Sequence, residues 1–269
     1  MKNLKLAAVC LSCLTMTGCS ALNFSVEGLI NAPKLTSEQS EIHQALIESV
    51  GSNITLKYPK NGEYRSAYVI ANIDDEPTDE AMVFYEYTSN GSEEDGLRVN
   101  ILDKDEDGKW YSVKELAGAG TDIDQVIISP MGSNNQTDVF VGYQNLTNDE
   151  KTMEIYSYTD GDFKRVALDT YSVLEPLDIN NDGYIELITI QRSTNNDTGA
   201  VTAKASMLNM KNNEITRGEN VDMCDNVTSY VSSKTGMLDS GRRAIFIDGL
   251  TADGKLQTEI IYYRYSGLQ

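Results

Sequence analysis

The stretch Glu186-Leu187-Ile188-Thr189-Ile190 decides the fold, because an acidic residue followed by an apolar run recurs along the chain. Similar stretches begin at Glu80 and Asp138, and a fourth begins at Arg243 and keeps the apolar run without the acid. A short apolar run precedes each of the first three copies, and a run that ends in a turn follows every copy. Another run begins after the first three turns. Short runs separated by Gly, Asn and Asp are typical of strands, so the pattern predicts repeated four-stranded units.

The predicted units repeat about every 50 residues, which is the size of a β-propeller blade. We therefore expect an all-β fold, a β-propeller-like array of about four blades that fills residues 54–269. The units are expected near residues 54–118, 119–171, 172–229 and 230–269. A β-sandwich of hairpins is the alternative arrangement of the same strands.

The fourth unit ends inside its turn at Ser266-Gly267, so we expect its last strand to be missing. One explanation is an incomplete propeller, a fragment of a longer one, and the unequal lengths of the units favour it. The other is that Ile54–Tyr58 supplies the missing outer strand and closes a small ring. An open array would leave unpaired strand edges, which invite association.

One short helix is predicted before the strands, within residues 36–53. Thr36-Ser37-Glu38-Gln39 has the form of a capping box, with Thr36 as the N-cap residue. Apolar residues then recur at helical spacing, namely Ile42, Ala45, Leu46 and Val50. Gly51 is a plausible C-terminal cap. His43 lies off the apolar stripe, so we expect it on the solvated surface with no chemical role.

The N-terminus has the features of an export signal. Lys2 and Lys5 form a short positive region, and Leu6–Met16 carries no charge and is too short to span a bilayer. The next residues, Met16-Thr17-Gly18-Cys19, resemble the bacterial lipobox, although Met16 stands where that family prefers Leu. The resemblance implies cleavage after residue 18 and lipidation of Cys19. An uncleaved signal anchor and a plainly secreted protein are the alternatives.

If the lipobox is used, residues 1–18 are a signal peptide and 19–35 are a tether. The lipid on Cys19, palmitate among its acyl chains, then anchors the chain in a bacterial cell membrane, facing outside the cytoplasm. Cys10 and Cys13 leave with the signal, so Cys224 is the remaining thiol and no intramolecular disulfide is possible. Acidic neighbours argue against a nucleophilic thiol, and we expect Cys224 to be a small buried residue.

One loop in the third unit has a metal-binding pattern. It reads Asp178-Ile179-Asn180-Asn181-Asp182-Gly183-Tyr184-Ile185-Glu186, with oxygen side chains at positions 1, 3, 5 and 9. Gly183 permits a sharp turn, and Tyr184 can offer its backbone carbonyl. Ca²⁺ takes six to eight such oxygens. The loop is not an EF-hand, because Thr189 stands where that motif needs a bidentate Glu.

The end of the pattern at position 9, directly before an apolar strand, makes the loop similar to the calcium loops of FG-GAP/VCBS repeats. Those repeats build integrin-type propellers. The resemblance implies Ca²⁺ as cofactor, with the ligands Asp178, Asn180, Asp182, Tyr184 and Glu186. The alternative is a solvated hairpin turn rich in Asn and Asp.

The first unit carries a degenerate copy of the loop over residues 72–80. Asn72, Asp74 and Glu80 match positions 1, 3 and 9, but Pro77 replaces the glycine. Because proline cannot reach a positive φ, this loop is the weaker metal candidate. The corresponding loops of the second and fourth units lack the carboxylates and are expected to be metal-free. Asp103–Gly108 lacks a closing ligand and is expected to be a solvated hairpin tip.

The composition excludes several classes of function. The formal net charge is −19, from 22 Lys and Arg against 41 Asp and Glu, which argues against nucleic-acid binding. No nucleotide-binding glycine motif is present, and one histidine argues against His-based sites. We expect a non-catalytic recognition or scaffolding module on the cell surface, with an extracellular protein or a glycan as partner. The alternative is an extracellular carbohydrate-active hydrolase or lyase, but among 41 acids no catalytic pair can be chosen.

Overall fold

The protein is described by a computed structural model over residues 35–88, 96–131, 137–145, 150–195, 197–211, 214–218, 220–225, 227–265 and 267–269. The chain forms two compact units, Met1–Ser40 and Glu41–Gln269. The predicted signal peptide, Cys19 and the tether up to residue 34 lie outside the described residues. Among those described, no helix has the length and apolar character needed to cross a membrane.

The predicted helix is present as α3 (Ser37–Val50). Its capping box is formed, since the Gln39 amide donates to Thr36 Oγ1 and the Thr36 amide donates to Gln39 Oε1, both at 3.1 Å. Gly51 follows with a φ of +84°. His43, expected on the solvated surface, is half-buried there, and its Nδ1 lies 2.8 Å from Tyr68 Oη because α3 packs on the strand that carries Tyr68.

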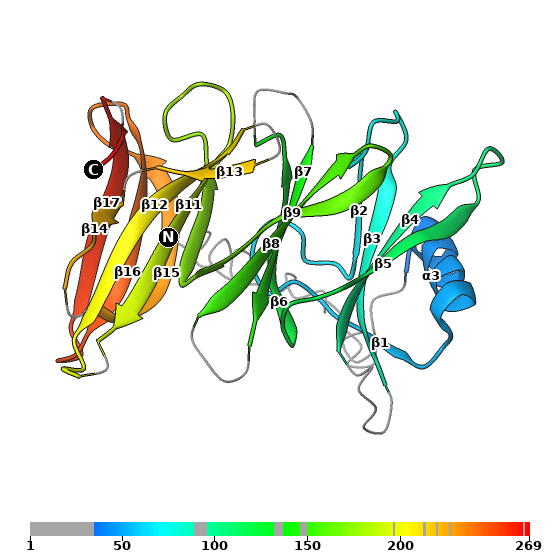
Figure 1. The fold of residues 1–269 in the computed structure, drawn as a ribbon, viewed down its shortest axis with the longest axis horizontal. Coiled ribbons are helices and arrows are strands. Elements are labelled where there is room, and N and C mark those ends of the chain that lie inside the picture. The colour runs from blue at the N-terminus through cyan, green and yellow to red at the C-terminus, as the bar shows by residue number, and fades with distance from the viewer. Residues whose placement is uncertain are drawn as a thin grey trace, which may run out of the picture. The chain divides into compact units, whose positions relative to one another are not determined.

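The strands form four antiparallel sheets in chain order, and none of them closes on itself in the described part of the chain (Figure 1). The first sheet, in the order β1-β3-β4-β5 with β2 also paired to β3, consists of β1 (Ile54–Leu56), β2 (Tyr68–Ala71), β3 (Glu80–Tyr87), β4 (Leu97–Lys104) and β5 (Trp110–Ala117). The second sheet runs in sequence order through β6 (Asp122–Ser129), β7 (Asp138–Gln144), β8 (Lys151–Thr159) and β9 (Asp162–Tyr171).

The last two sheets follow the same plan. The third sheet contains β10 (Val173–Leu177), β11 (Glu186–Thr194), β12 (Val201–Lys211), β13 (Glu214–Arg217) and the short β14 (Val221–Asp222), which also pairs with β12. The fourth sheet contains β15 (Val227–Met237), β16 (Arg243–Thr251), β17 (Leu256–Arg264) and β18 (Gly267–Leu268). The four recurring stretches each begin a strand at the predicted residue, so the all-β prediction is confirmed.

At the ends of the array, the structure contradicts the predicted loss of the last strand and one of the two alternatives offered to explain it. The fourth unit does have a last strand, because Gly267–Leu268 pairs with Tyr263 and Arg264 of β17. Ile54–Leu56 does not complete a ring, because it pairs with Tyr85–Tyr87 of β3 in the first sheet. The apolar residues of β1 help to cover α3, and that local burial decides the pairing.

The core of the Glu41–Gln269 unit is built between neighbouring sheets. One apolar cluster joins the first and second sheets around Phe84 and Tyr143, another joins the second and third around Phe140 and Leu187, and a third joins the third and fourth around Ile190. A fourth cluster packs α3 against the first sheet. Burying each such side chain stabilises the fold by about 1.5–3 kcal/mol.

Candidate metal loops and an inner-strand cavity

The acid that begins three of the four recurring strands closes the loop before it. The Ile179 amide donates to Glu186 Oε2 at 3.1 Å, and in the first sheet the Ile73 amide donates to Glu80 Oε2 at 2.8 Å. The second sheet repeats the bond at 3.3 Å, from the amide of Met131 to Asp138 Oδ2. The loop before Asp138 lacks the carboxylate set, so this role of the acid needs no metal ion.

Sequence reasoning identified the recurring acid but assigned it no structural role. In the sequence, an acid stands directly after each of three loops of quite different composition. That recurrence could have indicated that the acid has a structural role. A buried carboxylate that accepts a backbone N–H satisfies an amide that would otherwise be left without a partner. The residues between the two bonded groups can then vary, which explains why the loop compositions differ.

In the third-unit loop, an amide nitrogen joins two carboxylates. Asn180 Nδ2 donates to Asp182 Oδ2 at 3.0 Å and to Glu186 Oε1 at 2.9 Å. The Asp182 amide donates to Asp178 Oδ1 at 3.0 Å, so the loop gathers the predicted side-chain ligands at positions 1, 3, 5 and 9. Tyr184 is placed by its own amide, which donates to Asp182 Oδ1 at 2.9 Å.

The backbone of this loop makes the sharp turn that its glycine predicted. Gly183 has a φ of +95°, and the preceding Asn181 has a φ of +62°. Both values lie in the left-handed region, which glycine and asparagine adopt at the least cost. This turn directs the side chains on either side of it toward the same interior.

A cation from the next sheet already contacts one of these acids. Arg243, the residue that replaces the acid at the start of β16, places Nη1 at 3.0 Å from Asp178 Oδ2. The same nitrogen donates to the Asp178 backbone carbonyl at 2.8 Å. The guanidinium therefore neutralises one of the three carboxylates of the loop and joins the third sheet to the fourth.

Among the residues that the structure describes, no three or more His, Cys, Asp or Glu side chains are arranged to hold a metal ion. The donor chemistry of the 178–186 loop still fits Ca²⁺. Carboxylate oxygens of Asp182 and Glu186 converge on the Asn180 amide, whose own oxygen accepts the Asp182 backbone amide at 2.8 Å, so side chains of the kind that Ca²⁺ takes as ligands lie together. Asp178 can contribute fully only when Arg243 releases it.

Burial affects the acids that close both candidate loops. It raises the pKa of Glu186 to about 7; the Ile179 amide opposes this shift, and the nearby charges of Asp182 and Asp178 add to it. The pKa of Glu80 is likewise raised to about 7 by burial, again opposed by a backbone amide. A bound cation would favour the ionised form in either loop.

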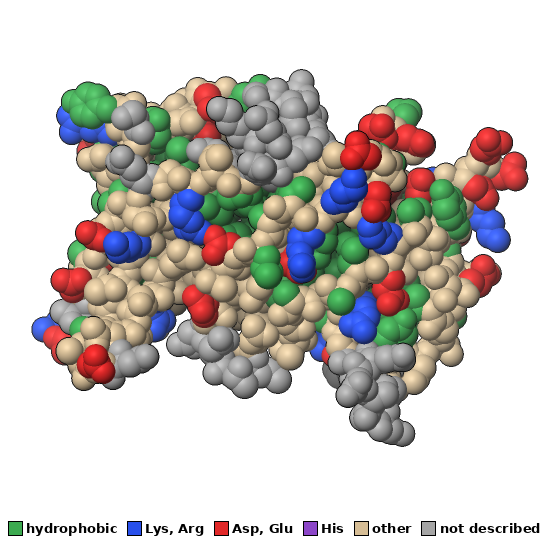
Figure 2. All heavy atoms as spheres, viewed as in Figure 1, with side chains coloured by type: hydrophobic (Ala, Val, Ile, Leu, Met, Phe, Trp, Pro, Cys, Tyr) green, Lys and Arg blue, Asp and Glu red, His purple; other side chains and the backbone are tan. Residues whose placement is uncertain are grey.

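The first-unit loop fills its interior with its own donor. Asn72 Nδ2 donates to the carbonyl oxygens of Glu76 and of Thr78, the latter at 3.0 Å. Glu80 Oε1 is buried and has no hydrogen-bond partner in the described part of the chain. Figure 2 shows acidic side chains at the tips of the β2–β3 and β4–β5 connections, where this loop meets solvent. Asp74 and Glu80 are therefore not joined by a shared donor.

The remaining Asp-rich segment behaves as expected. Asp103–Gly108 forms the hairpin between β4 and β5, where Asp105 Oδ1 accepts the amides of Asp107 at 3.0 Å and Lys109 at 2.8 Å. The turn residues are exposed. The second unit's loop, residues 132–136, lies outside the described residues.

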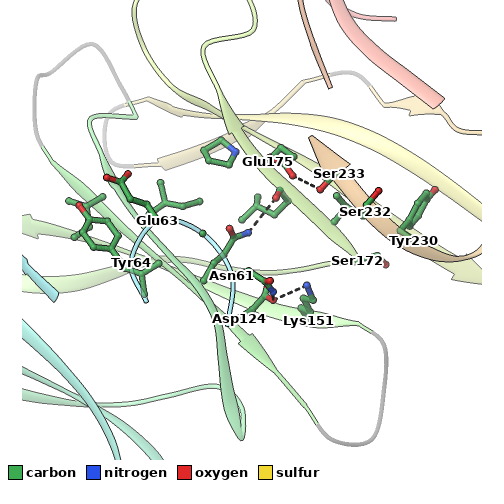
Figure 3. A pocket seen from close by; sticks show the side chains of 18 of the residues that line it. Asn61, Glu63, Tyr64, Asp124, Lys151, Ser172, Glu175, Tyr230, Ser232 and Ser233 are labelled. Carbon is green, nitrogen blue, oxygen red and sulfur yellow. Dashed lines mark hydrogen bonds and ion pairs between the residues drawn. The ribbon is translucent and has the colours of Figure 1, made fainter. Parts of the chain in front are cut away.

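A polar cavity of about 540 Å³ lies away from these loops, where the first strands of three sheets meet residues 61–64 (Figure 3). β6, β10 and β15 border it, and each of them pairs with only one neighbour, β7, β11 and β16 respectively, in the described sheets. Their second edges therefore pair with no further strand of the described sheets. On β6, the backbone amides of Lys60 and Asn61 donate to the carbonyls of Ile123 and Asp124 at 3.1 and 2.7 Å, and side chains reach other backbone groups. For example, Gln125 Nε2 donates to the Leu174 carbonyl at 3.3 Å.

Asp124 is the most buried acid of the cavity, with 1% of its surface exposed. One oxygen accepts Asn61 Nδ2 at 2.8 Å and lies 2.9 Å from Lys151 Nζ. The other accepts the Tyr171 hydroxyl at 2.6 Å. Three donors hold this carboxylate, so it is a fixed, charge-paired group of the cavity wall.

Glu175, from β10, is held less tightly. It accepts a hydrogen bond from the Ser233 hydroxyl of β15, and burial raises the pKa of its carboxyl group above the ordinary value. Glu63 also lines the cavity and is exposed. Sequence reasoning missed this site, since its residues come from four separated segments and no local motif connects them.

The prediction that Cys224 is buried was wrong, because it is exposed between β14 and β15. Its amide donates to Glu259 Oε2 at 2.7 Å, which holds the segment at the surface. Burial of the sulfur and the charge of Glu259 raise the pKa of the thiol, as expected for a cysteine among acids.

No model of a known protein family matches the sequence, and no curated protein is similar to it. Among solved structures, a mannose phosphorylase from Leishmania mexicana, in complex with phosphate ion, is similar over 85% of this chain and 73% of its own. The identity is 9% and the TM-score is 0.25, and a likeness this distant supports no conclusion about the present chain.

Proposed function

We propose that this chain is a non-catalytic recognition module of the bacterial cell envelope, lipid-anchored through Cys19 and stabilised by Ca²⁺ in the 178–186 loop. The observation that carries the proposal is the polar cavity bordered by β6, β10 and β15. Three sheets and the 61–64 segment contribute to it, so its shape is fixed by the packing of those sheets on one another. A preformed cavity with a few placed polar groups is what ligand binding requires.

A propeller-like arrangement is part of the proposal. The first strand of every blade in a propeller faces the central axis, and successive blades pack face to face. Here the first strands of three successive sheets border one cavity, and apolar clusters join each sheet to the next. Both features support the propeller-like array predicted from the repeats.

Ca²⁺ would supply a fixed positive charge to the third-unit loop. It would be held by Asp182, Glu186 and the Asn180 amide, with Tyr184 offering its carbonyl and Asp178 joining when Arg243 releases it. The loop leads directly into β11, the strand next to β10 of the cavity wall. The residues of the loop thereby keep the cavity wall in place, while the cavity itself makes the contacts with the ligand.

Full-length protein in detergent tests the recognition function on arrays of glycans and peptides, scored for bound ligand and for released product. Retention of a ligand without any product supports a binding module, and release of a product contradicts it. Membrane fractionation tests the anchor, because Cys19→Ser should move the protein to the soluble fraction. Continued membrane retention of that variant would contradict lipidation at Cys19.

A carbohydrate-active hydrolase remains the second candidate, and one observation favours it. Asp124 and Glu175 line the same cavity, and burial raises the pKa of the Glu175 carboxyl group, as is typical of a general acid. The three donors on Asp124 weigh against it, because they leave that carboxylate little freedom to act as a nucleophile or base. Product release that is lost in Glu175→Gln would establish this candidate.

A further inference from the structure

The charges of the inner-strand cavity are unbalanced. Its charged lining residues are Glu63, Asp124, Glu175 and Lys151, three acids against one base. Lys151 is already engaged, since its Nζ lies 2.9 Å from Asp124 Oδ1. Among the described residues, no basic side chain lies within ion-pair distance of Glu63 or Glu175. Glu175 in the wall and Glu63 at the exposed rim thus carry negative charge without a positive partner among the described residues.

This excess of negative charge in the cavity lining favours cationic ligands over anionic ones. A carboxylate in a partly buried wall loses hydration, and only a positive group or strong donors restore that loss. The hydroxyl of Ser233 is the one donor recorded on Glu175, and it is a neutral one. An anionic ligand would be repelled by both free carboxylates, while a cation would be drawn to them.

The rest of the cavity suits a polar frame around that positive group. Figure 3 shows Glu63 and Tyr64 on one side and Ser232, Ser233 and Tyr230 on the other, with Glu175 between them. Hydroxyl groups and amides on these walls can exchange hydrogen bonds with a ligand, and the tyrosine rings offer flat apolar surface. The volume is within the range of cavities that enclose small organic ligands.

We propose that the cavity binds an organic cation, a primary ammonium group on a hydroxyl- or amide-bearing frame, with Glu175 facing the ammonium and Glu63 adding negative charge at the exposed rim. The inference rests on the proposed recognition function and names the ligand class of that same site. An amino sugar and a lysine side chain both carry this chemistry, and the test separates them.

Titration calorimetry on the full-length protein in detergent provides the test, with ligands matched in shape and different in charge. The dimer of glucosamine with free amines is compared with its N-acetylated counterpart, and a lysyl dipeptide is compared with its acetyl-lysine form. We expect at least one amine to bind with Kd below about 1 mM and its acetylated partner to bind roughly tenfold or more weakly. The stronger amine identifies the source.

Glu175→Gln keeps the shape of the side chain and removes its charge, so it should weaken amine binding roughly tenfold. Glu48→Gln, on the exposed side of α3, makes the same charge change away from the cavity and should leave the affinity unchanged. If Glu175→Gln does not fold, Glu63→Gln at an exposed position tests the same point. Rising salt should weaken amine binding in the unaltered protein.

Equal binding of the acetylated ligands, stronger binding of an anion, or no amine binding up to about 1 mM would each overturn the inference. These failures are distinct from failure of the recognition function. If neutral glycans were retained on the array and no amine bound in solution, the recognition function would be supported and only the preference for a cation would be contradicted. Product release would remove the recognition function whatever the amine result.

Discussion

Two loops can be compared, the third-unit loop (residues 178–186) and the first-unit loop (residues 72–80). The same hydrogen bond closes both of them, but the side-chain hydrogen bonds inside them differ. In each, a buried glutamate at the start of a strand accepts the amide seven residues earlier, and burial raises its pKa to about 7. In the third-unit loop, two carboxylates converge on one amide nitrogen. In the first-unit loop, the side-chain amide is that of Asn72, at position 1, and it donates to backbone carbonyls.

The difference teaches that the acid that closes a loop and the set of metal ligands within it are independent features. The acid keeps the loop closed in both cases, so its presence alone does not indicate a cation. The metal pattern also needs acceptors that converge, and these follow from the left-handed turn at Gly183, which Pro77 cannot make. In the first-unit loop, which lacks that turn, the Asn72 amide donates to backbone carbonyls, and Glu80 Oε1 has no hydrogen-bond partner in the described part of the chain.

The largest expected effect is stabilisation by calcium through the third-unit loop alone. At a free Ca²⁺ concentration 100 times Kd, the free energy of unfolding should rise by about 2.7 kcal/mol. For a domain of this size that corresponds to a rise in Tm of roughly 5–10 °C. Differential scanning calorimetry of the full-length protein, with and without Ca²⁺, measures it.

Asp178→Ala combined with Asp182→Ala should abolish the calcium shift, and Asp74→Ala in the first-unit loop is the matched control that should keep it. A shift that persists in the double variant would refute the ligand assignment. A shift that is lost in Asp74→Ala instead would reverse the comparison and make the first-unit loop the metal site.

The next effect concerns the shared closure. Without calcium, Glu186→Ala and Glu80→Ala should each lower the free energy of unfolding by about 1–3 kcal/mol, because each leaves a buried amide without its acceptor. Urea denaturation measures this. Glu→Gln at the same positions keeps an acceptor oxygen and should cost less. Equal losses for the Ala and Gln variants would show that charge, not closure, is the role of the acid.

The pH dependence should show a smaller effect. A carboxyl group whose pKa is about 7 in the folded protein and near 4.3 when unfolded favours folding fully below pH 4 and loses that contribution as pH rises through 7. Without calcium, we therefore expect Tm to fall between pH 5 and pH 8, as measured by thermal melts followed by circular dichroism.

Glu186→Gln should make the decrease of Tm with rising pH smaller, and Glu80→Gln should reduce it by a further amount. Saturating calcium should remove the contribution of Glu186 and leave that of Glu80, because only the third-unit loop would hold the ion. A pH profile that neither substitution changes would place the titrating group elsewhere.

The smallest effect tests the arginine that shares Asp178. Arg243→Gln removes a half-exposed ion pair worth about 0.2–1 kcal/mol, so the calcium-free protein should lose about that much stability. The same change frees Asp178, and calcium affinity measured by calorimetry should rise up to about fivefold. Lys234→Gln, on the neighbouring strand β15, is the charge-matched control. An unchanged or weaker affinity in Arg243→Gln would show that Asp178 is not a ligand.

Much of the fold could be predicted because its signals are local. The starts of β3, β7, β11 and β16 follow from one charged residue and the apolar run after it. The capping box of α3 follows from two residues that are three positions apart. Local backbone preference and side-chain alternation determine such elements before any tertiary contact forms. The oxygen-rich loop at Asp178 was likewise visible, since its side chains are neighbours along the chain.

By itself, then, the amino-acid sequence determined where the four recurring strands begin, how the helix is capped and which loop gathers oxygen atoms. Only the tertiary structure decided that Arg243 contacts Asp178, that β1 pairs with β3, and that Cys224 is exposed. It also decided the cavity of Asp124 and Glu175, whose walls come from separate sheets. The physical reason is that burial and charge pairing act between side chains far apart in sequence, where no local pattern specifies the partner.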